Sequence, residues 1–131
     1  MTLFVDASAL VAIIAGEEGA ADLAHRLDAD ERRVTSPMAR WEAIVALRRA
    51  REYDWRYAAE SVDALLALKA IQIVAIGALE GQMALNCFAR YGKGLHPAKL
   101  NMGDCFAYAC AITNDARLLY KGDDFSKTDL A

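Results

Sequence analysis

Residues 3–16 read LFVDASALVAIIAG, and the rest of the chain is interpreted outward from this stretch. Residues 3–5 form a short apolar run that predicts a buried β-strand. Residues 7–15 predict a helix, and Gly16 is the kind of residue at which helices commonly end. Asp6 lies between the two elements. Asp6 is therefore expected at the carboxyl end of a strand, which is where α/β folds place their ligand sites.

Strand and helix patterns alternate along the remaining sequence. Ser36 followed by Pro37 is a typical helix start, because serine caps a helix and proline fits its first position. The alternation predicts a parallel sheet covered by helices on both faces. The expected helices are residues 17–27, 36–53, 55–68, a segment around 83–91 and 104–113 after an Asn101 cap, and the expected further strands are residues 34–35, 71–76 and 117–120.

The composition describes one globular domain. The chain has 131 residues, of which 56% are hydrophobic, enough for a core and too many for a disordered chain. The formal net charge is −3, but 14 acids remain against 15 bases when one acid is set aside at each of the four sites described below. Charge alone therefore neither supports nor excludes a nucleic-acid partner.

The cysteines and the N-terminal residues indicate the cellular compartment that we expect for the protein. Cys87, Cys105 and Cys110 lie in apolar helical segments and form no Cys-x-x-Cys pair. Because the first residues also lack the basic region of a signal peptide, we expect reduced, buried thiols in a cytoplasmic protein. Residues 7–16, the longest uncharged run after Asp6, are too few to span a bilayer, so no membrane association is expected.

Acidic residues recur where a strand ends or a helix begins. They are Asp6, Glu42, Asp104 and the adjacent pair Asp123 and Asp124. Each has an ordinary interpretation when taken alone: a helix N-cap for Asp6, a first-turn acid for Asp104, a boundary side chain for Glu42 and a plain turn for the pair. An α/β fold would nevertheless bring all of them to one edge of the sheet. Carboxylates that converge there repel one another unless a cation joins them.

The conjunction of these acids predicts a divalent metal site, and therefore phosphate chemistry. Carboxylate and water oxygens are the ligands that suit Mg²⁺ or Mn²⁺. Zinc is disfavoured because His25 and His96 are far apart in the sequence and the cysteines do not pair. The sequence also contains no Gly-rich phosphate loop and no Gly-x-Ser-x-Gly elbow.

Two other classes of protein remain open at this point. A non-enzymatic binding module would use the same scaffold, with its acids as helix caps, as a subunit of a regulatory complex. A receiver-like domain would accept phosphate on Asp6, but it would need a further acid beside it, and residues 2–5 supply none. Titration with Mn²⁺, read by thermal shift, would separate a metal site from a set of helix caps.

Four segments together resemble a known family. They are residues 4–9 (FVDASA), 36–42 (SPMARWE), 100–109 (LNMGDCFAYA) and 118–129 (LLYKGDDFSKTD), which span the chain in order. The chain resembles PIN-domain ribonuclease toxins of the VapC type, from type II toxin-antitoxin systems. The Asn-x-Gly-Asp and Gly-Asp-Asp-Phe segments are its most specific parts. The resemblance implies a single PIN-like domain over residues 1–131, with four to five parallel strands flanked by helices on both faces.

The resemblance also implies an activity and roles for particular residues. The activity is metal-dependent hydrolysis of RNA phosphodiester bonds by an endoribonuclease. The site would contain Asp6, Glu42, Asp104 and Asp124 as catalytic acids that hold Mg²⁺ or Mn²⁺, Asp123 as the alternative to Asp124, and Ser8 and Asn101 as residues that support the metal ligands.

Partners are the last implication. The family resemblance implies an antitoxin, which we expect across the N-terminal helices, a homodimer, and DNA bound only indirectly through the antitoxin. The aromatic side chains of Trp41, Tyr53, Trp55 and Tyr57 favour an interface there, although core packing is expected for Trp41 itself. RNA phosphates are expected to meet basic side chains, with Lys93 and Lys99 preferred; the candidates are Arg40, Arg48, Arg49, Arg51, Lys93, Lys99 and Lys121.

Overall fold

The computed structural model describes residues 1–50 and 52–131, and Arg51, one of the expected RNA contacts, lies outside them. Four strands of the described residues form one parallel sheet in the order β3-β2-β1-β4. Their bounds are Thr2–Val5 for β1, Arg32–Thr35 for β2, Ile71–Ile73 for β3 and Ala116–Leu119 for β4. β1 pairs with β4 up to Val5 and Leu119, so these two strands end side by side. The expected parallel sheet is confirmed.

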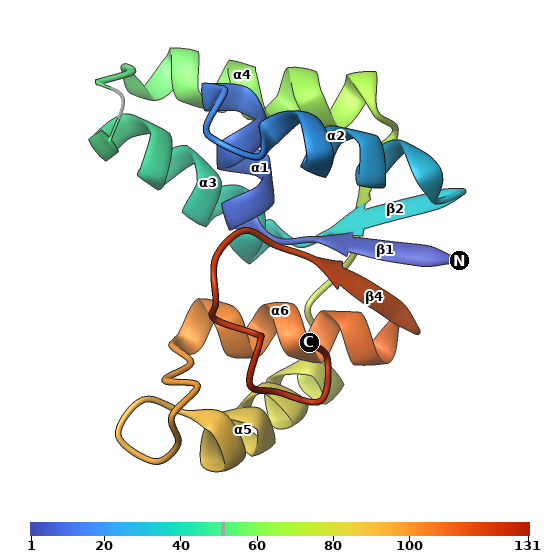
Figure 1. The fold of residues 1–131 in the computed structure, drawn as a ribbon, viewed down its shortest axis with the longest axis vertical. Coiled ribbons are helices and arrows are strands. Elements are labelled where there is room, and N and C mark those ends of the chain that lie inside the picture. The colour runs from blue at the N-terminus through green and yellow to red at the C-terminus, as the bar shows by residue number, and fades with distance from the viewer. Residues whose placement is uncertain (51) are drawn as a thin grey trace.

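Helices cover both faces of this sheet (Figure 1). One face carries α1, α2, α3 and α4, and the other carries α5 and α6. Their bounds are Ala7–Ala15 for α1, Ala20–Ala29 for α2, Pro37–Ala50 for α3, Trp55–Leu68 for α4, Ala78–Tyr91 for α5 and Met102–Thr113 for α6. Within the described residues, none of these helices combines the length and the apolar character needed to cross a membrane.

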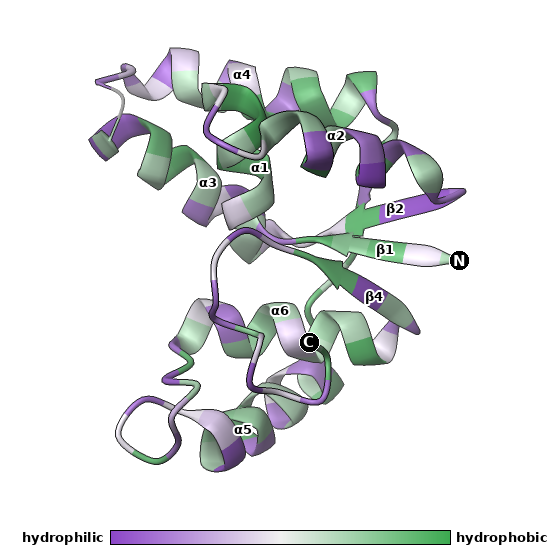
Figure 2. Ribbon diagram, in the orientation of Figure 1, coloured by the Kyte–Doolittle hydropathy of each residue, from purple (hydrophilic) through white to green (hydrophobic). Residues whose placement is uncertain are grey.

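The strands divide the core in two because successive side chains of a strand point to opposite faces. Leu3 and Val5 pack with the α1–α4 layer, whereas Phe4 between them packs with α5 and α6. Leu118 and Leu119 of β4 divide in the same way. Figure 2 shows hydrophobic residues in β1 and towards the carboxyl ends of β2 and β4, and hydrophilic residues in the segment after β4.

Some boundaries differ from those expected. The second helix begins at Ala20 rather than at Glu17, because Gly16 and Gly19 adopt left-handed φ values of 66° and 85° and leave Glu17 in a turn. β3 ends at Ile73, although the β-branched run predicted a strand to residue 76. Its neighbour β2 ends at Thr35, so the sheet offers residues beyond 74 no further partner strand among the described residues.

The buried side of α3 also differs from the expected one. Ala39, Ala43 and Leu47 are its buried residues, whereas Trp41 is 63% exposed. α3 packs against both α1 and α4, and small side chains permit that close approach. The expectation that Trp41 packs in the core is therefore wrong, and its ring is available at the surface.

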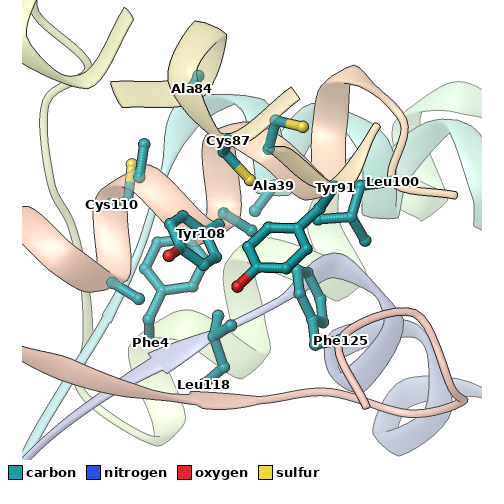
Figure 3. Packing of buried hydrophobic residues seen from close by; sticks show 14 of the residues in the cluster. Phe4, Ala39, Ala84, Cys87, Tyr91, Leu100, Tyr108, Cys110, Leu118 and Phe125 are labelled. Carbon is teal, nitrogen blue, oxygen red and sulfur yellow. The ribbon is translucent and has the colours of Figure 1, made fainter. Parts of the chain in front are cut away.

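The segment after β4 is fixed against the α5–α6 layer. Phe125 is fully buried in the same cluster as Leu118 (Figure 3). Asp129 accepts hydrogen bonds from the hydroxyl groups of Tyr91, at 3.2 Å, and Tyr108, at 2.7 Å. These contacts restrain the turn that carries Asp123 and Asp124.

The three cysteine side chains are buried and reduced, as expected from the sequence. Cys87, Cys105 and Cys110 are buried and form no disulfide.

Candidate active site

Four separate segments meet where β1 and β4 end and α1 and α6 begin. A cavity of about 320 Å³ lies there. Its lining includes Asp6 after β1, Glu42 of α3, Asp104 of α6 and Asp124 after β4, together with Ser8 and Asn101. Six of the seven expected site residues therefore share one cavity, although they are spread from one end of the sequence to the other.

Asp6 belongs to both the sheet and the first helix. Its backbone N–H donates to the carbonyl of Leu119 at 3.0 Å, which extends the pairing of β1 with β4. Its Oδ2 accepts hydrogen bonds from the backbone N–H of Ser8, at 3.0 Å, and from Ser8 Oγ, at 2.6 Å. The helix-cap interpretation is thus correct, and the same side chain, only 6% exposed, lines the cavity.

Asp104 is held by a capping box at the start of α6. Asn101 Oδ1 accepts a hydrogen bond from the Asp104 backbone N–H at 2.9 Å, and Asp104 Oδ2 accepts one from the Asn101 N–H at 3.1 Å. The Asp104 side chain is 8% exposed. Capping therefore fixes the direction of a buried carboxylate rather than merely ending a helix.

Glu42 approaches the start of α6 from α3. A Cβ atom at Gly103 would overlap the Glu42 carboxylate, so the missing side chain at Gly103 is what admits Glu42 to this position. Glu42 is half-buried, as are Met38, four residues before it, and Val45, three residues after it. Its place in the cavity thus depends on a glycine of another helix.

The turn after β4 distinguishes between the two adjacent acids. Gly122 adopts a φ of 96°, a turn conformation that glycine reaches without strain, and Asp124 returns to the cavity. Asp123 is not among the described lining residues, and its carbonyl accepts hydrogen bonds from Ser126. The geometry favours Asp124 over Asp123 as the fourth acid.

Burial and mutual repulsion raise the pKa values of three of these acids. Burial, with the charges of Asp6 and Asp104, raises the pKa of Glu42 to about 7. Burial also raises the pKa of Asp104 to about 7, against the hydrogen bond from the Asn101 backbone and with the charges of Asp124 and Asp6 adding to it. The pKa of Asp6 is raised by burial, opposed by the hydrogen bonds from Ser8. The carboxylates of Asp6, Glu42 and Asp104 thus each lie close enough to another acid to feel its charge, as expected for acids that gather in one cavity.

The donor set fits a hard divalent cation. In residues 1–50 and 52–131, no three Asp, Glu, His or Cys side chains are arranged so that they could already hold a metal ion. Carboxylates that repel one another are expected to stand apart until a cation draws them together. The described lining offers carboxylate, hydroxyl and amide oxygens, and neither imidazole nor thiol. Mg²⁺ and Mn²⁺ prefer such oxygens and keep several water ligands, so Asp6, Glu42, Asp104 and Asp124 are the residues that would hold one.

Cavity size alone does not mark this site. A larger cavity, of about 460 Å³, lies beside α2 and β4. Its buried acid, Asp30, accepts two hydrogen bonds at 2.9 Å from Arg117, so its charge is already compensated. The smaller cavity is the one in which buried acids face each other.

Two further charged residues are among the described lining of the acidic cavity: Glu17 and Lys121. Sequence analysis placed Glu17 at a helix start and gave Lys121 no preference among the possible RNA contacts. Lys121 Nζ lies 3.2 Å from Glu17 Oε1. The position of Glu17 depends on the turn between α1 and α2, which no local pattern predicted. Lys121 was easier to find, because it precedes Asp124 by three residues in the segment that carries the resemblance.

Comparison with known proteins identifies the family to which this chain belongs. The sequence matches the PIN domain family over residues 3–130. It is 44% identical to a VapC ribonuclease of Rhizobium meliloti, over 97% of this chain and 98% of that protein, and 37% identical to ribonuclease VapC42 of Mycobacterium tuberculosis, over 98% and 96%. The crystal structure of Mycobacterium tuberculosis VapC20, a sarcin-ricin loop cleaving toxin, shares the fold, with a TM-score of 0.72 at 23% identity over 95% of this chain and 92% of that one. This chain therefore belongs to the PIN domain family and, within it, to the VapC ribonucleases.

Proposed function

We propose that this protein is a metal-dependent endoribonuclease that hydrolyses RNA phosphodiester bonds as the toxin of a toxin-antitoxin pair. The observation that carries the proposal is the convergence of Asp6, Glu42, Asp104 and Asp124 on one cavity. The names of relatives that match over nearly the full length support ribonuclease activity. The all-oxygen donor set supports Mg²⁺ or Mn²⁺ as the cofactor.

The residues of the cavity have separable tasks. A divalent ion held by the four acids would act as a Lewis acid on the phosphate and lower the pKa of a water molecule. Ser8 and Asn101 keep the carboxylates of Asp6 and Asp104 in one direction through their hydrogen bonds. Glu42, which reaches the cavity beside Gly103, would hold the ion or position the attacking water.

The test is cleavage of a mixed-sequence RNA by the purified protein after EDTA treatment and after addition of Mg²⁺ or Mn²⁺. We expect cleavage only with metal, and products that carry a 5′-phosphate and a 3′-hydroxyl group. Asp6→Asn and Asp104→Asn should abolish cleavage while keeping the fold, because the amide oxygen of asparagine can still accept the hydrogen bonds from the backbone N–H groups of Ser8 and Asn101. Asp22→Asn, an exposed acid of α2, is the matched control. Undiminished cleavage in EDTA, or by both cavity variants, would refute the proposal.

We further propose that a cognate antitoxin covers the N-terminal helices. Trp41 of α3 and Trp55 and Tyr57 of α4 are each more than half exposed, and large aromatic side chains gathered at a surface favour an interface. Co-purification with the antitoxin should be lost in a Trp41→Ser, Trp55→Ser double variant. It should persist in Leu95→Ser, which alters an equally exposed apolar residue of the loop before α6. Equal co-purification of both variants would rule out this surface.

The remaining partner proposals follow from the family. We propose a homodimer, contact with DNA only through the antitoxin, and action on RNA in the cytoplasm. Light scattering of the purified protein tests the dimer, since a monomeric mass at micromolar concentration would contradict it. DNA binding by the toxin alone would contradict the indirect contact.

A further inference from the structure

The acidic cavity contains one basic side chain among its described lining residues, that of Lys121. Five acids surround it, because Glu17 lines the cavity together with the four proposed metal-binding residues. An RNA strand that enters such a cavity meets negative charge from nearly every side. Among the described lining residues, Lys121 is therefore the one whose charge attracts a phosphate group, apart from any bound metal.

The backbone of Lys121 is fixed to the centre of the site. Its N–H donates to Ser8 Oγ at 3.0 Å, and Ser8 Oγ donates to Asp6 Oδ2 at 2.6 Å. Two residues earlier, the carbonyl of Leu119 accepts a hydrogen bond from the Asp6 N–H at 3.0 Å. The Cα atom of Lys121 thus has a defined position relative to Asp6, and only its flexible side chain is left to move.

The side chain of Lys121 forms an ion pair with Glu17 that a phosphate group could replace. Its ammonium group lies 3.2 Å from Glu17 Oε1, and the two side chains are 38% and 25% exposed. A pair with this much solvent access contributes little to stability, so little is lost when a phosphate oxygen replaces the carboxylate. The Glu17 backbone is itself fixed by a hydrogen bond from its N–H to the carbonyl of Ala12 at 3.0 Å.

Four other basic residues that the sequence offered as RNA contacts are less suited to this role. Arg40 makes two hydrogen bonds to Asp63, at 2.8 and 2.9 Å, and Arg48 stacks over the ring of Trp55. Lys93 and Lys99, preferred from the sequence, lie outside the described lining of the cavity. Lys121 is the candidate whose backbone is bonded to the acidic centre.

We propose that Lys121 binds a non-bridging phosphate oxygen of the RNA strand at the rim of the acidic cavity, and that Glu17 holds its ammonium group there until RNA replaces it. This inference rests on the proposed ribonuclease function and assigns a substrate-binding residue to the same site. Lys121 would then position the strand, whereas the acids carry out the chemistry.

Steady-state cleavage of a fluorescein-labelled, mixed-sequence single-stranded RNA provides the first test. Lys121→Gln should raise KM by about 5-fold, the size expected for one exposed charge-assisted contact, and change kcat by less than about 2-fold. Lys121→Arg should restore most of the loss. Lys127→Gln, an exposed lysine outside the cavity lining, is the matched control and should match the wild-type protein.

The salt dependence of binding provides a readout that a structural role would not change. Anisotropy of the same RNA, measured on the Asp104→Asn protein between about 50 and 200 mM KCl, gives the slope of log Kd against log salt concentration. Adding Lys121→Gln should reduce that slope by about 0.7, the value for one phosphate contact to a single strand. An unchanged KM together with an unchanged slope would overturn the proposal.

The role of Glu17 is tested by a double-mutant cycle. Glu17→Gln should lower KM by about 2-fold because it frees the ammonium group, and this gain should vanish in the Lys121→Gln background. A gain that persists there would show that Glu17 merely repels RNA, and it would overturn the holding role. If the wild-type protein cleaves no RNA but Lys121→Gln still reduces the slope, the ribonuclease proposal fails and the phosphate contact stands.

Discussion

Two groups of buried acids in this molecule have opposite surroundings. Asp30, at the end of α2, is 8% exposed, and both of its carboxylate oxygens accept hydrogen bonds from Arg117. Asp6 and Asp104 are buried to the same degree, yet the donors that bind them are neutral groups of Ser8 and Asn101. Asp30 thus has a cation that belongs to the fold, whereas the described hydrogen bonds of Asp6 and Asp104 come from neutral groups alone.

The difference separates structure from function in physical terms. A buried carboxylate without a cation is costly, and a fold keeps it only where something outside the chain offsets that cost. The pKa values of Glu42 and Asp104, each raised to about 7 mainly by burial, express the same cost. Asp30 and Asp6 are buried to a similar degree, so burial alone would not show which of them has a structural role and which a functional one. The charge of the group that donates hydrogen bonds to each carboxylate does.

The largest expected effect is that the same substitution impairs catalysis in the cavity but stability at Asp30. Asp104→Asn should lower the rate of RNA cleavage by roughly a thousandfold or more, without lowering the free energy of unfolding, because it removes a repelled charge. Asp30→Asn should leave cleavage near the wild-type rate and destabilise the protein by about 1–2 kcal/mol, a value discounted because Arg117 is largely exposed. RNA cleavage assays and urea denaturation of both variants measure the two properties. The distinction collapses if Asp30→Asn cleaves as slowly as Asp104→Asn.

Sequence reasoning located the acids whose positions depend on local rules. Asp6 follows an apolar run and caps a helix, and Asp104 stands three residues after the Asn101 cap. Both features are contained in a few consecutive residues, so pattern and capping preference were sufficient. The parallel sheet then required that Asp6 and the turn after β4 lie at the same edge.

The features that sequence reasoning missed depend on contacts between distant segments. Trp41 is exposed because α3 presents Ala39 and Ala43 to neighbouring helices, a choice that apolar periodicity alone does not determine. Glu17 reaches the cavity because two left-handed glycines delay the start of α2. Such placements follow from packing of whole elements, which no short window of sequence contains.

A smaller effect is expected from adding one methyl group at Gly103. The new Cβ would overlap the Glu42 carboxylate, which lies at the far end of a flexible side chain and can move away. Gly103→Ala should therefore lower cleavage by about 10- to 100-fold through misplacement of Glu42, with a change in stability below about 1 kcal/mol. Gly81→Ala on α5, where a Cβ would meet nothing within 4 Å, is the matched control for the same substitution in a helix. Equal activity of the two variants would show that the position of Glu42 is unimportant.

The smallest expected effect concerns pH and Glu42. The carboxyl group of Glu42 ionises from about pH 4.5 in the unfolded chain but only near pH 7 in the folded protein. Between these values the unfolded state binds fewer protons, so the free energy of unfolding falls as pH rises from about 4.5 to 7. Glutamine carries no charge at any pH, so Glu42→Gln should match the wild-type protein at pH 4.5. At pH 8 without metal it should be more stable by about 1–2 kcal/mol, a value reduced for partial exposure and shared titration with Asp104.

At Glu80, the same Glu→Gln substitution should change the free energy of unfolding at pH 8 in the opposite direction. Its side chain accepts a hydrogen bond from the Gly77 N–H at 2.7 Å, and this bond lowers the pKa of Glu80. The stabilising effect of ionised Glu80 is therefore present above the pKa of the unfolded chain and is lost as pH falls. Glu80→Gln should consequently have a lower free energy of unfolding than the wild-type protein at pH 8 and a similar one at low pH. Urea denaturation of both variants between pH 4.5 and 8 would show stability differences that diverge in opposite directions as pH rises. Differences of the same sign at pH 8 would mean that Glu42 has a stabilising partner, and the contrast between the cavity acids and the paired acids of the fold would no longer hold.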